Sequence, residues 1–346
     1  MERQSNIELL RIVATLMILL VHYSGWLLTF VGIDTFWYGG TTMIVNRATL
    51  YALTCIGVPL FVLISGYFSI RPKVRSLLNL FTCLAFFYVG TYILNCWVTG
   101  EAVFQHHRVL RCLMAFSHEN WFIQCYLFLM LLSPVLNAFV EKVSEKALLT
   151  YILIFMGCAF YFGCVHDSTY FYFNRGFSVT SFILIYLIGR YVRLYGEKRL
   201  QQVASWKIAM TWIGCTVLIC VWKLFMPEYG IYVTYHSPIL ILSAVMLFML
   251  FSRMSFQSKV VNWMGTSCLA AYILHTNAPV LGWMIQSDEY LLNTNNAGIW
   301  ICGAISICIG VFIVAILLDK VRIWMSKPLI NLVDKMIQKG NFICNH

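Results

Sequence analysis

The sequence predicts an all-α integral membrane protein, a single bundle of about ten transmembrane helices. Of its 346 residues, 60% are hydrophobic and only 11% are charged, whereas about a quarter of the residues in a soluble domain are charged. Long apolar runs recur from end to end, and no Pro/Gly/Ser-rich linker separates them. These observations exclude a water-soluble fold. They predict one membrane domain over residues 1–346, in which 319–346 form a cytoplasmic tail.

The lengths of the apolar runs define the predicted spans. A helix needs about 20 mainly apolar residues to cross the hydrocarbon of a bilayer, and it satisfies its own backbone hydrogen bonds there. The first run contains Arg11 and lacks a small-residue cleavage site, so we expect it to be a span and not a signal peptide. The predicted spans are 7–30, 48–70, 76–98, 121–140, 147–166, 176–195, 205–226, 233–252, 263–285 and 297–318.

The distribution of positive charge predicts that both termini face the cytoplasm. With the N-terminus inside, most of the 24 Lys and Arg residues fall in cytoplasmic loops, tails and span ends, as the positive-inside rule requires. The exceptions that fall outside are Arg47, Arg108, Arg111 and Arg175. Because orientation accounts for the basic residues, the net charge of +10 does not predict a nucleic-acid partner, and the lipid bilayer is the expected environment.

The 13 cysteines predict neither disulfides nor a metal site. They form no CxxC motif and no Cys/His metal spacing, and most of them, such as Cys55 and Cys215, lie in apolar runs. In that setting cysteine behaves as a small hydrophobic residue.

The tail carries apolar residues at a spacing that suits a helix on the membrane surface. Met325, Leu329, Leu332 and Met336 follow one another at intervals of four, three and four residues. A short cytoplasmic tail explains the same stretch equally well.

Ionisable residues inside spans are costly, and each is therefore a functional candidate. The first span contains Glu8, Arg11 and His22. The step from Arg11 to His22 is about 1100° of helix, so both lie within roughly 20° of one face and about 16 Å apart. His22 should lie roughly 20 Å deep, and His275 of the ninth span comes to nearly the same depth, so we expect the two imidazoles to converge. The alternatives are a snorkelling Arg11 and histidines that serve packing only.

A second cluster lies at the cytoplasmic end of the second span. The Gly of a Ser-Gly-Tyr sequence lies there at a depth similar to that of Arg11, and the basic turn that follows projects below both residues. The residues are Ser65, Gly66, Tyr67, Arg71, Lys73 and Arg75. A cationic mouth of this kind suits an anionic ligand with phosphates, although ordinary positive-inside charge explains the turn as well.

On the outer side, a loop rich in His and Arg leads into the fourth span at Trp121. The loop ends with His118, Glu119 and Asn120. Trp121 is either an interfacial anchor or an aromatic face that stacks on a sugar ring. Lys223, near the outer end of the seventh span, is expected to snorkel outward or to line the acceptor site.

Taken in order, these motifs resemble the membrane acyltransferase 3 family. The resemblance rests on Asn6-Ile7-Glu8-Leu9-Leu10-Arg11 with His22, on Pro59-Leu60-Phe61 with Ile64-Ser65-Gly66-Tyr67, on Asn120-Trp121-Phe122 with Tyr126 and Ser133-Pro134-Val135-Leu136-Asn137, and on Tyr272-Ile273-Leu274-His275. Two of these motifs, the start from Glu8 to Arg11 and the pattern from Trp121-Phe122 to Asn137, are most similar to members encoded with bacterial capsule and exopolysaccharide genes.

The resemblance implies a bacterial inner-membrane O-acyltransferase that moves an acyl group, acetyl in the first instance, from cytoplasmic acyl-CoA to a glycan or lipid-linked sugar. Arg11 and His22 match the family's arginine and catalytic histidine, and Arg71 and Arg75 match arginines that handle acyl-CoA. Asn120, Trp121, Tyr126 and His118 are the expected acceptor-binding residues. Many relatives carry a further soluble domain after the membrane core, so here the membrane domain is expected to complete the reaction itself or with a partner, such as a second copy or an export complex.

The expected mechanism uses His22 as the general base for a sugar hydroxyl. Glu8 and Arg11 would shape the donor channel, and His275 would orient the acceptor or the developing oxyanion. Direct transfer and an acyl-histidine intermediate both remain open. The rival classes are a transporter or flippase for a glycan or small anion, which also uses intramembrane Arg and His, and a membrane-embedded sensor or scaffold. The chain shows no convincing repeated halves of the kind found in transporters.

Overall fold

A computed structural model describes residues 3–24, 40–100, 120–165, 173, 176–225 and 234–344, and these residues form helices and no strands. The all-α prediction is confirmed for them. The helices are α1 (Ser5–Tyr23), α2 (Gly40–Thr54), α3 (Gly57–Phe68), α4 (Val74–Thr99), α6 (Trp121–Lys142), α7 (Glu145–Phe160), α8 (Val179–Tyr191), α9 (Glu197–Gln201), α10 (Ser205–Phe225), α11 (Pro238–Ser252), α12 (Lys259–Gly265), α13 (Cys268–Thr276), α14 (Ala278–Asn293) and α15 (Ala297–Cys344); π-helical turns η3 (Tyr161–Val165) and η6 (Val192–Gly196) follow α7 and α8.

By length and composition, the described residues support seven or eight of the predicted ten membrane crossings. Among the described residues, seven helices are long and apolar enough to cross a membrane, or eight if the bent pair of α13 and α14 forms one span. The predicted sixth and eighth spans correspond to α8 and α11, which have only 13 and 15 residues. The chain is therefore a multi-pass α-helical membrane protein, with seven or eight helices of sufficient length and hydropathy to span a bilayer in its described part.

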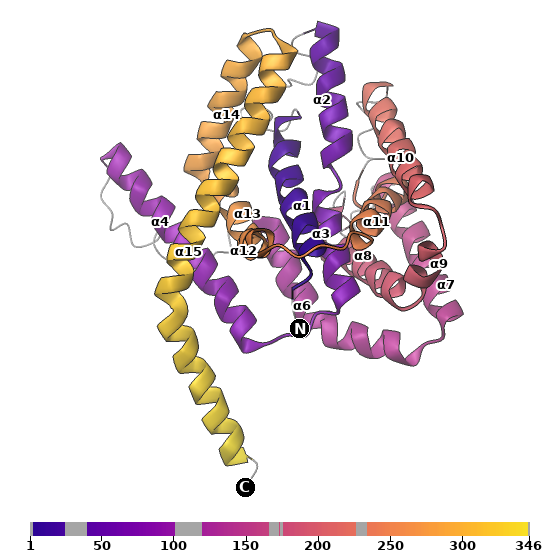
Figure 1. The fold of residues 1–346 in the computed structure, drawn as a ribbon, viewed down its shortest axis with the longest axis vertical. Coiled ribbons are helices and arrows are strands. Elements are labelled where there is room, and N and C mark those ends of the chain that lie inside the picture. Colours follow the sequence, from indigo (N-terminus) through magenta and orange to yellow (C-terminus); the bar gives the residue numbers. More distant parts are fainter. Residues whose placement is uncertain are drawn as a thin grey trace.

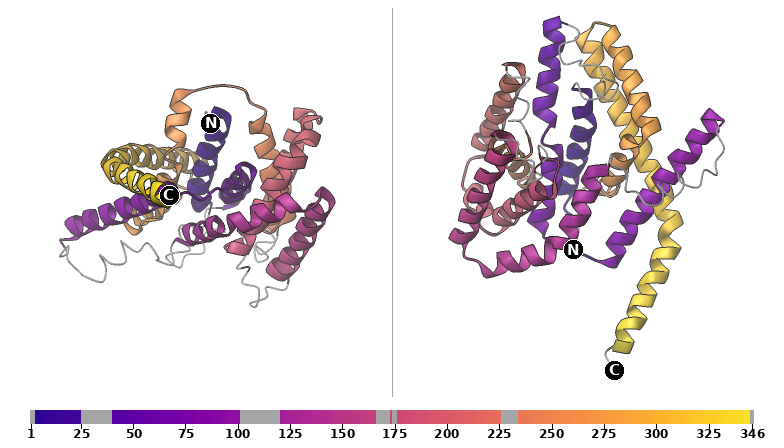
Figure 2. Two further views of the ribbon diagram at one scale, coloured as in Figure 1. Left: turned by 90° about the horizontal axis from the view of Figure 1, so that it is seen from below. Right: turned by 180° about the vertical axis from the view of Figure 1, so that it is seen from behind.

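Helix α1 lies at the centre of the bundle. It packs against α2, α3, α11, α12, α13 and α15, and Figure 1 shows it enclosed by these elements, with α7 to α11 on one side and α4, α14 and α15 on the other. The views in Figure 2 show the same arrangement from below and from behind. The N-terminal end of α1 and the C-terminal half of α15 point to the same end of the molecule (Figure 1).

The predicted ninth span, 263–285, is wrong as one continuous helix. It is interrupted after Gly265 and again at Asn277, where α13 and α14 meet at an angle of 76°. The second break has a covalent cause, because residue 279 is proline and cannot donate a backbone hydrogen bond to the carbonyl of His275. The Asn277 side chain stabilises the corner by donating from Nδ2 to the Ile273 carbonyl at 2.8 Å and accepting from Thr91 Oγ1 at 3.0 Å.

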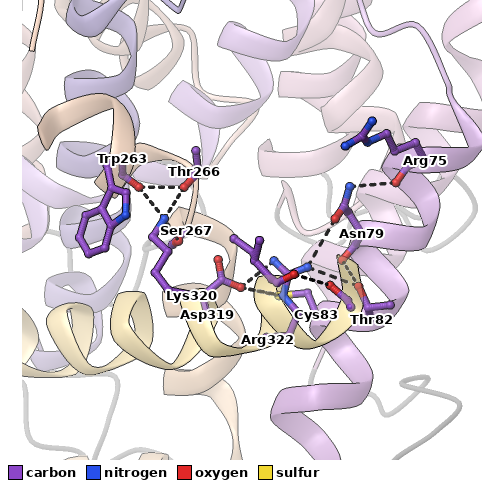
Figure 3. A network of polar contacts seen from close by, with 12 residues as sticks. Arg75, Asn79, Thr82, Cys83, Trp263, Thr266, Ser267, Asp319, Lys320 and Arg322 are labelled. Atoms are coloured by element: carbon purple, nitrogen blue, oxygen red, sulfur yellow. Dashed lines mark hydrogen bonds and ion pairs between the residues drawn. The ribbon is translucent and has the colours of Figure 1, made fainter. Parts of the chain in front are cut away.

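The predicted end of the tenth span at residue 318 lies within a longer helix. Helix α15 continues through this point to Cys344. At the expected boundary, Asp319 and Arg322 are both buried and form an ion pair at 2.7 Å. Arg322 also donates to Thr82 at 3.3 Å and to Asn79 at 3.5 Å. This buried network, shown in Figure 3, joins α15 to α4 and explains why charged residues continue the helix instead of ending it.

Candidate active site

One face of α1 carries a line of polar side chains that runs from its N-terminal end into the bundle. Glu8, Arg11, Thr15 and His22 lie on this face, which packs against α12 and α13. Opposite them stand Gly265, Cys268 and His275. We call these seven residues the polar seam.

Glu8 and Arg11 form the end of the polar seam that lies near the N-terminus of α1. The Glu8 carboxylate is buried, and it lies 3.5 Å from the Arg3 guanidinium and 3.7 Å from that of Arg11. It fits against the helix end at Gly265, where the Cβ of any other residue would collide with the carboxylate. The absence of a side chain at Gly265 therefore makes room for the charged pair.

His22 and His275 meet at the other end of the polar seam, in the interior of the bundle. Their ring centroids are 5.0 Å apart, with the planes tilted by 52°. His275 is fully buried, whereas His22 is half-buried. The two imidazoles lie together as their predicted depths require, even though the ninth span is not continuous.

The hydrogen bonding of His275 assigns its tautomer. Nδ1 lies 3.1 Å from the carbonyl oxygen of Ala271, and since a carbonyl can only accept, Nδ1 carries the proton. Nε2 is then an unprotonated acceptor, and it has no hydrogen-bond partner among the described residues. The ring can accept one proton in a place shielded from water, which is the chemical property of a general base or of a group that orients another histidine.

Two residues of this region were missed by the sequence analysis. The thiol of Cys268 is buried against the Thr15 hydroxyl, within electrostatic reach of Glu8, Arg11 and Lys320. Lys320 was assigned to the tail, but its ammonium group donates to the Trp263 carbonyl at 2.7 Å, to Thr266 at 2.6 Å and to Ser267 at 3.0 Å (Figure 3). It therefore ties α15 to the break between α12 and α13, where the seam begins. Spacing along one helix could not reveal a contact between elements so distant in sequence.

The basic turn does not act as one unit in the structure. Arg71 and Lys73 are exposed between α3 and α4. Arg75 is also exposed, but it pairs with Asp334 of α15 at 3.2 Å. Of the three cations, Arg71 and Lys73 have no ion pair with any described residue.

The three residues of the Ser-Gly-Tyr sequence make contacts with three different parts of the structure. Ser65 donates to the Phe61 carbonyl at 2.8 Å and lies 3.2 Å from the hydroxyl of Tyr126, so the structure brings together two predicted ligand-binding residues. Tyr67 hydrogen-bonds to Glu197 and Arg193 beyond the end of α3. Gly66 contacts the backbone of α8 at Tyr186, where a Cβ would overlap the carbonyl oxygen.

Gly66→Ala should therefore destabilise the fold. The obstacle is backbone on a neighbouring helix, which cannot rotate away, and we expect a loss of about 1–3 kcal/mol of stability. Thermal unfolding of the purified protein in detergent measures it. Gly90→Ala is the matched control, because a Cβ at Gly90 of α4 meets nothing within 4 Å and alanine favours helix. Equal unfolding temperatures for the two variants would contradict the packing role of Gly66.

Trp121 belongs to an aromatic cluster at the start of α6. Its ring lies 4.8 Å from Phe177 and 6.1 Å from Tyr235, centroid to centroid. Phe122 leads from this cluster to Tyr272 at 4.8 Å, and Tyr272 to His275 at 5.4 Å. Aromatic contacts thus connect the predicted acceptor-binding region with the histidine pair. Asn120 is fully buried at the start of α6, and His118 lies outside the described residues.

Comparison with known protein families gives an assignment. A family model described as an acyltransferase domain, Acyl_transf_3, matches residues 4–320, nearly the whole chain. The chain belongs to the acyltransferase 3 family. No curated protein and no solved structure matches it.

As a member of the acyltransferase 3 family, the chain is a membrane acyltransferase, and the family match includes every residue of the polar seam. Within the described residues, no group of three or more His, Cys, Asp or Glu side chains could hold a metal ion. The expectation that the protein has no metal site stays a prediction.

Proposed function

We propose that this membrane acyltransferase is an O-acetyltransferase that moves an acetyl group from cytoplasmic acetyl-CoA to a hydroxyl of a cell-surface or exported polysaccharide. The observation that carries the proposal is the polar seam. A fully buried histidine with a free acceptor nitrogen lies against a second histidine, and a carboxylate and an arginine lead to the pair along one helix face.

The proposal places both chain ends in the cytoplasm of a bacterial inner-membrane protein. Positive-inside charge supports this orientation, and so does the fact that the N-terminal end of α1 and the C-terminal half of α15 point to the same end of the molecule (Figure 1). The donor then enters from the side of Arg3, Arg11 and the exposed cations Arg71 and Lys73. The acceptor approaches from the side of Trp121, whose ring suits contact with the apolar face of a sugar.

In the proposed reaction His22 removes the proton of the sugar hydroxyl as its oxygen attacks the thioester carbonyl. A hydroxyl is a weak nucleophile until this proton is taken, and a neutral imidazole is suited to take it. The carbon–sulfur bond then breaks, the CoA thiolate leaves, and the proton held by His22 can neutralise it. His275 orients the His22 ring or the acceptor through Nε2, while Glu8 and Arg11 fix the donor end of the seam. An acyl-His22 intermediate would reach the same products in two steps.

The test is transfer of radiolabelled acetyl from acetyl-CoA to surface glycan in membranes with and without the protein. Label that appears in glycan only when the protein is present supports the proposal. If purified protein neither binds acetyl-CoA nor transfers label, the proposal is wrong and a transport function becomes the better explanation.

A further inference from the structure

Three helices begin close together on the side from which the acceptor is proposed to approach. The ring of Trp121, the first residue of α6, lies 4.8 Å from that of Phe177 and 6.1 Å from that of Tyr235, and these last two rings are 5.3 Å apart. Phe177 and Tyr235 precede α8 and α11 by two and three residues. Gly176 adds a backbone contact, because a Cβ there would lie 2.7 Å from the backbone nitrogen of Tyr235. The N-terminal ends of α6, α8 and α11 therefore converge.

Two of these N-terminal ends lie within the membrane in the proposed orientation. Helices α8 and α11 have 13 and 15 residues, a length of about 20 and 23 Å against about 30 Å of hydrocarbon. Arg193 and Arg253 follow their C-terminal ends at the cytoplasmic boundary, so both helices begin below the outer surface. A helix N-terminus has partial positive charge and unpaired N–H groups. Broken helices of transporters direct such ends at anionic substrate groups.

A buried histidine lies between two of these N-terminal ends. His236 is fully buried two residues before α11, and its Nε2 lies 3.2 Å from the hydroxyl of Ser181 in the first turn of α8. Its other ring nitrogen, Nδ1, is buried and has no hydrogen-bond partner among the described residues. Gly163 of η3 makes room for the ring, since a Cβ there would lie 3.2 Å from it. A buried ring nitrogen left unpaired inside a membrane protein is costly, and it points to a ligand.

A chain of hydroxyls at the start of α8 can make Nδ1 a hydrogen-bond donor. Ser178 Oγ lies 2.8 Å from both Thr180 Oγ1 and Ser181 Oγ. When each hydroxyl donates to the next group along the chain, from Thr180 toward the ring, Ser181 donates to His236 Nε2 and the ring proton is on Nδ1. Bonds that point in one direction polarise one another. The chain then ends in an N–H group that is free to donate to a ligand.

We infer that the N-terminal ends of α6, α8 and α11, together with His236 Nδ1, bind an anionic group of the acceptor, a sugar carboxylate or a phosphate. The inference rests on the proposed function, since it names the class of acceptor for that reaction. The positive helix ends attract the anion, and Nδ1 donates a hydrogen bond to it. Ring contacts of Tyr272 with Phe122 at 4.8 Å and with His275 at 5.4 Å connect this cluster to the histidine pair. An extended acceptor can therefore lie across both places.

The test compares how three small sugars inhibit acetyl transfer to surface glycan at constant ionic strength. Methyl glucuronide carries a carboxylate, glucose 1-phosphate carries a phosphate, and methyl glucoside is uncharged. At least one of the anionic sugars should inhibit at an about tenfold lower concentration than methyl glucoside, the effect of one hydrogen bond to a charged group. The more potent of the two identifies the anion. Its inhibition should weaken as the glycan concentration rises, and not as the acetyl-CoA concentration rises, because it competes with the acceptor.

Variants connect this preference to the site. His236→Phe keeps a ring in the same space and removes both nitrogens, so the preference for the anionic sugar should disappear; if this variant does not fold, Ser181→Ala, which removes the bond to Nε2, should weaken the preference. Ser243→Ala is the matched control and should keep it, since it removes a fully buried hydroxyl of α11 that has no hydrogen-bond partner in the described part of the chain. An unchanged preference in the folded site variants, or equal inhibition by all three sugars in the wild type, would overturn the assignment while acetyl transfer itself stands.

Direct binding separates this inference from the proposed function. If the wild type transfers acetyl to no glycan, the proposed function fails, and ligand-observed NMR of methyl glucuronide and glucose 1-phosphate with the purified protein then tests the site. Binding that requires His236 would support an anion site in a protein of another function. No binding of either sugar, or equal binding to the wild type and His236→Phe, would overturn the inference as well.

Discussion

His22→Ala should reduce acetyl transfer to background, a fall of about 100- to 10,000-fold in kcat if the imidazole acts as general base. Alanine cannot accept the hydroxyl proton, and His275 lies with its ring centroid 5.0 Å away, in a position set by its own bond to Ala271. The measurement is the rate of label transfer from radiolabelled acetyl-CoA at saturating donor, with the purified variant reconstituted in membranes.

Donor binding by His22→Ala and acetyl transfer by a control variant distinguish loss of the catalytic base from general loss of the fold. Acetyl-CoA should still bind His22→Ala, because the proposed donor contacts lie toward Arg11 and beyond it. Tyr23→Phe is the matched control, since it alters the adjacent residue of α1 by removing only a hydroxyl that lies 2.8 Å from Ser287; it should transfer acetyl at close to the wild-type rate. Activity retained in His22→Ala, or lost equally in Tyr23→Phe, would exclude His22 as the base.

The parts of the site that sequence could predict are those set by helical geometry within one element. Arg11 and His22 share a face because eleven residues bring a helix almost back to the same angle. The meeting of His22 with His275 needed only an estimate of depth in two spans that both run outward. That estimate survived the breaks around α13 because they lie at either end of that short helix, before Cys268 and after Thr276, and leave His275 within regular structure.

Other features depend on tertiary contacts that a single sequence does not reveal. Gly66 looked like part of a ligand-binding cluster at the end of a span, and the carbonyl of Tyr186 on α8 gives a separate, structural reason why no side chain fits there. The corner at Asn277 arises from Pro279 in an otherwise apolar run, where hydropathy alone predicts continuous helix. Lys320 and Arg322 looked like the charged end of a span, because their partners lie far away in the sequence, at Trp263 of α12, at Ser267 before α13 and at Thr82 of α4.

The network around Arg322 leads to the second large expected effect, on stability. Asp319→Ala should destabilise the protein by about 3–5 kcal/mol, because it leaves the buried guanidinium of Arg322 without its carboxylate. Both Nε and Nη2 of Arg322 donate to Asp319 Oδ1, at 2.9 and 2.7 Å, and the two side chains are 8% and 1% exposed. Hydrogen bonds from Arg322 to Asn79 and Thr82 satisfy Nη1 alone and cannot replace the lost charge. The unfolding temperatures of the variant and the wild type in detergent are compared, with unfolding monitored as the loss of the monodisperse peak.

The same two helices supply the control. Arg75 and Asp334 also join α4 to α15, but their side chains are 63% and 30% exposed, so Arg75→Gln should cost no more than about 1 kcal/mol. If burial of an unpaired charge causes the effect of Asp319→Ala, then replacing both partners in Asp319→Leu/Arg322→Met should recover most of the lost stability. A double variant as unstable as Asp319→Ala would show instead that the polar contacts of Arg322 with α4 hold α15 in place, and that its helix continues past residue 318 because of them.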